Sequence, residues 1–159
     1  MVRGTGMVKI FGKGFSLVEL MVVIGIISLL ALVALPSYKN FILRAEFIET
    51  KMAVGAVKVS FEVCAQMLGL AKVKNCQHNS HGIPAIKKPA KGVVGVRLVS
   101  DIFDANFSGG VNDGDQVKII ATAPLDSENA QQTYTLTATL SAGGGVEWDK
   151  GKCSKPELC

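Results

Sequence analysis

The sequence predicts an α+β fold in which one long N-terminal helix packs on a four-stranded antiparallel sheet. Two observations lead to this prediction. Residues 15–68 carry a continuous apolar run followed by apolar residues at helical spacing, and after residue 92 the pattern changes to that of β-strands. Because the strands follow one another after a single helix, we expect antiparallel neighbours.

A membrane-length apolar run begins directly after a short basic leader. The leader, residues 1–14, has no acidic residue and three basic ones: Arg3, Lys9 and Lys13. Residues 15–35 are uncharged apart from Glu19, and at about 1.5 Å per residue they can span a bilayer. No small-x-small cleavage site follows the run. We therefore expect cleavage between Gly14 and Phe15, with the N-terminus cytoplasmic and everything after the run outside.

A second helical pattern continues this run as far as residue 68. Gly25 and Pro36 interrupt the run, and proline predicts a kink because it removes a backbone hydrogen bond. From residue 37 onward, two adjacent rows of apolar residues at steps of three or four predict one wide buried face. The first row is Phe41, Ala45, Ile48, Met52, Ala56, Val59 and Val63, and the second is Val54, Val57, Phe61, Cys64 and Leu68.

The helix is thus expected to be roughly fifty residues long. The chain divides into a leader (1–14), a membrane and assembly helix (15–36) and a soluble domain (37–159). Glycine, proline and asparagine in residues 69–92 predict a loop. The four strands are then expected at residues 93–99, 116–123, 133–140 and 146–150.

The charge of the chain is nearly balanced outside the leader. The net charge is +4, and removing the three basic leader residues leaves 14 basic against 13 acidic side chains, or +1. A whole-surface attraction to nucleic acid or anionic membrane is therefore not supported. Local lysine clusters keep DNA contact open as an alternative: Lys72 and Lys74, and Lys87, Lys88 and Lys91.

Four cysteines, Cys64, Cys76, Cys153 and Cys159, all follow the apolar segment. An even number on the far side of a membrane signal indicates two disulfides in an oxidising compartment. Three connectivities are open, and we favour pairing of neighbours, Cys64 with Cys76 and Cys153 with Cys159. A zinc site is the weaker alternative, because there is no Cys-x-x-Cys motif and the two histidines are not at zinc-finger spacing.

No group of residues predicts catalysis or a cofactor. The run Asn112-Asp113-Gly114-Asp115 does not complete a calcium loop and is more typical of a turn. His78 and His81 lie in the loop without a nucleophile to activate, so we expect them to be solvated. The sequence therefore favours a protein that is not an enzyme.

Glu19 is the residue that most needs an explanation. A charge inside a membrane helix costs about 2.5–3.5 kcal/mol on the mildest scale. Snorkelling to the interface is one alternative, but glutamate is short for it. The functional interpretation is that Glu19 pairs with a cation of a neighbouring copy, and the α-amino group that cleavage would create on Phe15 is the nearest candidate. Such a pair would fix the register of a helical assembly.

The N-terminal motif resembles that of the type IV pilins. The matching residues are Gly14-Phe15-Ser16-Leu17-Val18-Glu19-Leu20-Met21-Val22-Val23-Ile24, followed by Pro36-Ser37-Tyr38. Trp148, and Cys153 and Cys159 with Pro156 between them, resemble the terminal disulfide loop of that family. The resemblance, to a type IVa-like prepilin with a class III signal peptide, implies that a prepilin peptidase cuts before Phe15 and N-methylates it.

In that family the acidic position of Glu19 neutralises the N-terminus of the neighbour, and the helix between Gly25 and Pro36 can lose helicity in the fibre. The resemblance implies a structural subunit of a pilus fibre for adhesion, twitching motility or DNA uptake. The subunit would be held in the inner membrane before assembly and be extracellular afterwards. Its implied partners are further copies, membrane lipid, the peptidase and the inner-membrane assembly machinery. A disulfide between Cys64 and Cys76 would not be a general family feature.

Two related functions stay open as alternatives. One is a type II secretion pseudopilin, against which the terminal cysteine loop argues, because major pseudopilins generally stabilise that end with calcium. The other is a DNA-binding competence (minor) pilin, in which the lysine loop or terminal loop would contact phosphates.

Overall fold

The computed structural model describes residues 14–104 and 106–159, without the side chain of Pro36. The leader predicted for residues 1–14 therefore lies outside the described residues, except for Gly14. The chain forms two compact units, Met1–Lys39 and Asn40–Cys159. One helix, α1 (Leu17–Leu68, 52 residues), contributes to both and confirms the predicted long helix. It is assigned as helix through Pro36, and the kink there stays a prediction.

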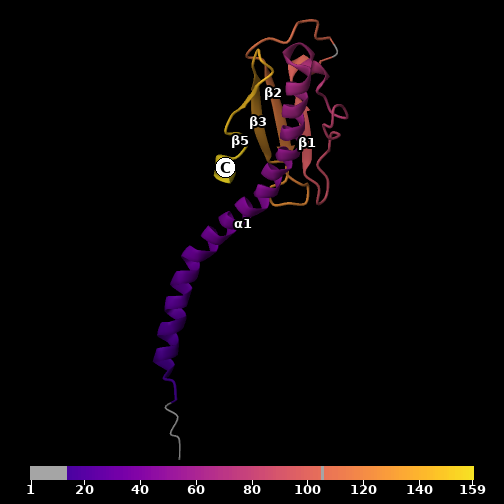
Figure 1. Cartoon of the computed structure of the whole chain (residues 1–159). Helices are drawn as coiled ribbons and strands as arrows, with labels where there is room; N and C mark the ends of the chain where they lie inside the picture. The colour runs from indigo at the N-terminus through magenta and orange to yellow at the C-terminus, as the bar shows by residue number, and fades with distance from the viewer. Residues whose placement is uncertain (1–13, 105) are drawn as a thin grey trace, which may run out of the picture. The chain divides into compact units, whose positions relative to one another are not determined.

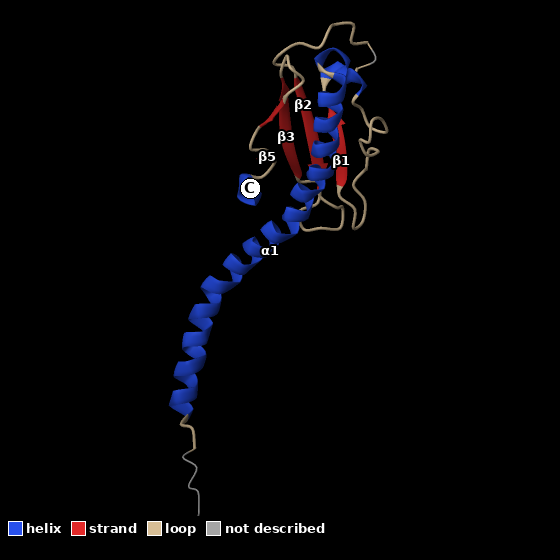
Figure 2. Cartoon of the chain, in the orientation of Figure 1, coloured by secondary structure: helices blue, strands red, loops and turns tan. Residues whose placement is uncertain are grey.

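The second unit contains an antiparallel sheet that packs on α1 (Figure 1). Its strands are β1 (Gly95–Val99), β2 (Gln116–Thr122), β3 (Thr133–Leu140), β4 (Val146–Trp148) and β5 (Lys152–Cys153). They pair in the order β1-β2-β3-β4, and β5 also pairs with β3. Short 3₁₀ helices at Leu70–Asn75, Asp101–Phe103 and Pro156–Leu158 complete the structure (Figure 2).

The sheet has one strand more than the four predicted, because the last predicted strand is interrupted. Trp148 of β4 pairs with Ala138, and Cys153 of β5 pairs with Tyr134. The chain advances five residues from Trp148 to Cys153, whereas β3 advances only four between the two partners. The extra residue makes a bulge, and Gly151 adopts the left-handed φ of 74° that such a bulge accommodates. β4 and β5 are thus the two halves of one bulged edge.

The core lies between the inward face of the sheet and one face of α1. The second predicted row is largely buried there, with Val54, Val57, Phe61 and Cys64 at 0–3% exposure. They contact the alternating inward residues of the two central strands: Val117, Ile119, Ala121, Leu136, Ala138 and Leu140.

The first predicted row was wrongly placed in the core. Its large members are 47–74% exposed, and we call them the α1 apolar stripe: Phe41, Ile48, Met52, Val59 and Val63. The helix carries more apolar residues per turn than one sheet can cover. The buried face of α1 includes Phe47 and Thr50, and the α1 apolar stripe next to it faces outward.

His78 is also more than a solvated loop residue. The backbone N–H of Leu98 donates to Nε2 of His78 at 2.6 Å, so the ring proton is on Nδ1 and donates to the Pro84 carbonyl at 2.6 Å. The half-buried imidazole therefore satisfies an amide at the edge of β1. His81, in contrast, is exposed as predicted.

Candidate functional site

The start of α1 is fixed by Ser16. The N–H of Glu19 donates to the hydroxyl of Ser16 at 3.2 Å, and the N–H of Leu20 donates to the Ser16 carbonyl at 3.2 Å. A serine accepting a hydrogen bond from the third helical residue is an N-cap, and it satisfies one of the free amides of the first turn.

Glu19 therefore occupies the first turn of α1. A carboxylate there is stabilised by the partial positive charge of the helix N-terminus. The pattern Ser16-x-x-Glu19 is the capping-box signature, and this signal was overlooked in the sequence. Among the described residues no ion pair reaches Glu19, so in the single chain its stabilisation comes from its own helix.

The rest of the first unit exposes apolar side chains all round. Phe15 and the other large apolar residues up to Leu35 are 42–75% exposed. The hydroxyl of Ser28 is satisfied within the helix, since it donates to the Ile24 carbonyl at 2.7 Å. α1 is long and apolar enough to cross a membrane, and its most apolar stretch is not buried against any other part of the described chain.

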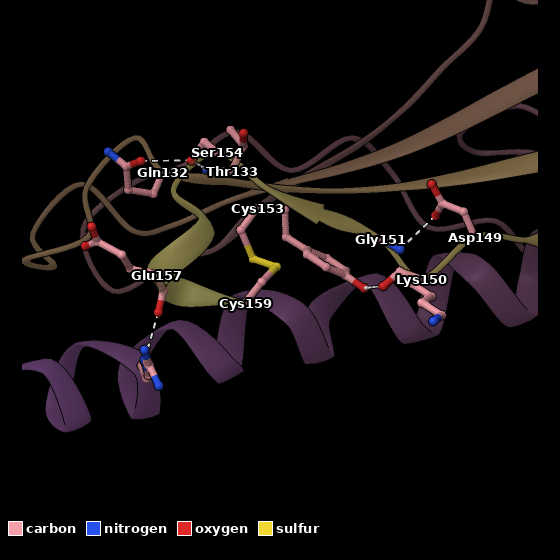
Figure 3. The surroundings of a disulfide bond; sticks show 11 residues. Gln132, Thr133, Asp149, Lys150, Gly151, Cys153, Ser154, Glu157 and Cys159 are labelled. Atoms are coloured by element: carbon pink, nitrogen blue, oxygen red, sulfur yellow. Dashed lines mark hydrogen bonds between the residues drawn. A yellow bond between two sulfur atoms is a disulfide. The ribbon is translucent and has the colours of Figure 1, made fainter.

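In the second unit, the C-terminal loop docks on α1. Cys153 and Cys159 are bonded, and Nε of Arg44 donates to the Glu157 carbonyl at 2.7 Å (Figure 3). Leu158 is buried against Phe47. The loop is therefore fastened both by its disulfide and by contacts with the helix.

Polar groups beside this loop hold the β4–β5 bulge. Asp149 accepts a hydrogen bond from the Thr137 amide at 3.0 Å. It also accepts one from the Gly151 amide at 2.8 Å (Figure 3). Partial burial acts to raise the pKa of Asp149, but these hydrogen bonds and nearby Lys152 outweigh it and lower the pKa below its ordinary value of 3.8. Burial, with a smaller effect of the Asp149 charge, raises the pKa of Tyr134 above 10.0.

The second disulfide joins Cys64 at the end of α1 to Cys76, and both residues are fully buried. Both bonds join the neighbour pairs favoured in the sequence. The Cys64–Cys76 bond closes the 3₁₀ segment Leu70–Asn75, which lies in the predicted loop of residues 69–92.

The remaining candidates lie apart from these features. In the segment proposed as a turn, the Asp115 side chain accepts from the Asn112 amide at 2.8 Å and Asp113 accepts from the Ala142 amide at 3.0 Å, so both carboxylates serve the backbone. The five clustered lysines are all exposed: Lys72, Lys74, Lys87, Lys88 and Lys91.

Comparison with known proteins finds a family motif around the start of α1 and several similar curated proteins. Residues 12–35 match the family described as the prokaryotic N-terminal methylation motif. The chain is 36% identical over 84 residues to the type IV pilus subunit protein TapA of Aeromonas hydrophila, covering 53% of this chain and 55% of that protein. It is 39% identical over 56 residues to a type IV major fimbrial protein FimA of Dichelobacter nodosus, covering 35% and 36%.

The chain thus carries the N-terminal motif of type IV pilins and is similar to type IV pilus and fimbrial subunits. A further relative, at 36% identity over 73 residues, is prepilin peptidase-dependent protein D of Escherichia coli, with 46% of this chain and 49% of that protein covered. The chain thus spans about half the length, or less, of the curated relatives it matches. Their names describe pilus and fimbrial subunits and not enzymes, in agreement with the sequence prediction.

Proposed function

We propose that this chain is a type IV pilin, a structural subunit of a type IV pilus fibre, and that it polymerises through the N-terminal half of α1. The observation that carries the proposal is the apolar segment of residues 15–35, which is exposed all round and has no partner within the described chain. A helix that is apolar on every side needs either lipid or other helices around it. Lipid would surround it before assembly, and neighbouring copies would surround it in the fibre.

Processing would create the assembling form. The N-terminal methylation motif spans the Gly14-Phe15 junction, which supports cleavage there and methylation of Phe15. The basic leader supports an inner-membrane subunit with a cytoplasmic N-terminus before cleavage. After assembly the fibre would be extracellular and would serve adhesion, twitching motility or DNA uptake. The disulfide-closed C-terminal loop supports a pilus subunit over a secretion pseudopilin.

Glu19 would set the register of the fibre. The helix N-terminus stabilises a carboxylate by about 0.3–1 kcal/mol, whereas burying that charge in an apolar surrounding costs about 2.5–3.5 kcal/mol. The difference calls for a cation, and the α-ammonium of Phe15 on the next subunit is the one that cleavage supplies. Each subunit would then be positioned by the N-terminus of its neighbour, with Pro36 and Gly25 allowing the helix to adapt.

The test is to shear fibres from cells and identify their subunits by mass spectrometry. The proposal predicts this chain in the fibres, with an N-terminal peptide that starts at Phe15 and carries one methyl group. Absence of the chain from sheared fibres, or fibres whose subunits retain residues 1–14, would contradict it.

A further inference from the structure

A glycosylation sequon lies in the connection from β1 to β2. Asn106-Phe107-Ser108 has the pattern Asn-x-Ser/Thr, with a residue other than proline in the middle, that marks acceptors of N-linked sugars. None of the other asparagines is followed two positions later by serine or threonine: Asn40, Asn75, Asn79, Asn112 and Asn129. Asn106 is therefore the only asparagine of this sequence that a sequon-reading enzyme can select.

The sequon occupies an exposed and irregular part of the second unit. It follows the 3₁₀ helix Asp101–Phe103 and precedes β2, and both Asn106 and Ser108 are exposed. Phe107 between them is half-buried and packs against the main core. Because the middle residue anchors the segment, the acceptor amide and the hydroxyl on either side of it are held at the surface.

An acidic residue precedes the acceptor. Asp104 lies two positions before Asn106, and its carboxylate accepts a hydrogen bond from the Asn106 backbone amide at 2.8 Å. The Phe107 backbone amide donates to the Asp104 carbonyl at 3.0 Å. Neither bond uses the side-chain amide of Asn106. The acceptor is thus flanked by an exposed carboxylate on one side and an exposed hydroxyl on the other.

Within the second unit, the sequon lies away from the C-terminal loop. The 3₁₀ helix before the sequon contacts the 3₁₀ segment Leu70–Asn75, which follows the end of α1. The C-terminal loop instead docks on α1 at Arg44 and Phe47. The helix rises about 30 Å from Phe47 to its end at Leu68. A sugar at the sequon would therefore leave the C-terminal disulfide loop uncovered.

The compartment also fits this chemistry. N-linked sugars are carried by surface loops of secreted segments. In the proposed topology everything after the membrane helix leaves the cytoplasm. The two disulfides, one of which joins the end of α1 to Cys76, belong to an oxidising compartment. The sequon lies between the two disulfides in the sequence and would share that compartment.

We propose that Asn106 is N-glycosylated with an oligosaccharide transferred from a polyprenyl diphosphate carrier. Nδ2 of Asn106 attacks C1 of the first sugar, and the new bond forms as the bond from C1 to the diphosphate oxygen breaks. The polyprenyl diphosphate leaves with that electron pair, and a base of the transferase takes the proton from Nδ2. Asp104 and Ser108 are the side chains that the transferase reads on either side of the acceptor. This inference rests on the proposed topology and not on polymerisation.

Mass spectrometry of the chain purified from membranes and from sheared fibres tests the modification. Trypsin releases residues 98–118 as one peptide, which contains both Asn106 and Asn112. We expect this peptide to carry the added mass of an oligosaccharide, and electron-transfer fragmentation to place that mass on Asn106. A peptide without sugar, or with sugar on Asn112 or on a serine, would overturn the proposal.

Matched variants of the same loop test how the acceptor is selected. Asn106→Gln and Ser108→Ala should each abolish the modification, although the second variant retains the asparagine. Ser108→Thr should keep it, and so should Asn112→Gln, which changes an exposed asparagine outside the sequon. Sugar retained in Ser108→Ala would overturn recognition of the sequon. Asp104→Asn should lower the modified fraction severalfold, and an unchanged fraction would overturn the role of Asp104.

The source of the purified chain separates this inference from the proposed function. Modified chain in membranes, with none in fibres, would support the modification and contradict the proposed fibre subunit. Unmodified chain in fibres would support the fibre subunit and overturn the modification alone.

Discussion

Two phenylalanines on the same helix offer a sharp test of which face of α1 is the core. Phe61 is fully buried and its ring meets that of Trp148 edge-on, with centroids 6.2 Å apart. Phe41, on the α1 apolar stripe, is 70% exposed. Truncating a buried phenylalanine to alanine costs about 3–5 kcal/mol, whereas an exposed one changes stability by about 0.5 kcal/mol or less.

The assay is urea unfolding of the full chain in detergent, followed by the fluorescence of Trp148, the single tryptophan. Phe61→Ala should lower the free energy of unfolding by about 3–5 kcal/mol, and Phe41→Ala should leave it within about 0.5 kcal/mol of the wild type. Phe61→Leu, which keeps most of the apolar volume, should fall between them. Equal losses for the two alanine variants would refute the assignment of the buried face.

Three further predictions concern the sheet edge, the bulge and the buried disulfide. His78→Ala should lower the free energy of unfolding by about 1–3 kcal/mol, because the Leu98 amide loses its acceptor; a change below about 0.5 kcal/mol in a denaturant titration would contradict this role of His78. Because folding lowers the pKa of Asp149, the ionised carboxylate stabilises the fold at pH values above its ordinary pKa of 3.8. This contribution is lost as the pH falls through the folded pKa. Asp149→Asn should therefore reduce the drop in melting temperature below that pH. An unchanged dependence of the melting temperature on pH would contradict this role of Asp149. Replacing both Cys64 and Cys76 by alanine should cost about 3 kcal/mol, from a loop with a sequence separation of 12; an unaltered unfolding midpoint would contradict this.

Elements that are defined by their own sequence pattern could be predicted from the sequence. The alternation of threonine with other residues predicted β3 with the bounds that the structure has, Thr133–Leu140. The helix was also predictable, because apolar spacing continues from the membrane-length run to Leu68. The bulge at Gly151 was missed, because one inserted residue leaves no mark on a period-2 pattern in so short a strand.

Features that depend on contacts between distant residues could not be read from the sequence. Two rows of apolar residues on α1 looked equally able to form the core, and only the position of the sheet selects the one with Phe61. The hydrogen bond from Arg44 to the Glu157 carbonyl joins two residues that no local motif connects. The Ser16 cap was different, since its Ser-x-x-Glu pattern is local and could have been recognised.

The central claim is that the carboxylate of Glu19 positions each subunit of a fibre built from N-terminal helices. The most direct test compares Glu19→Gln with the wild type by quantifying cleaved subunit in membranes and in sheared fibres. Glutamine keeps the size of the side chain and removes its charge. The account predicts normal cleavage at Gly14 but a loss of at least about tenfold in fibres, because the neighbour's N-terminal amine loses its buried partner. Wild-type amounts of fibre in this variant would contradict the account.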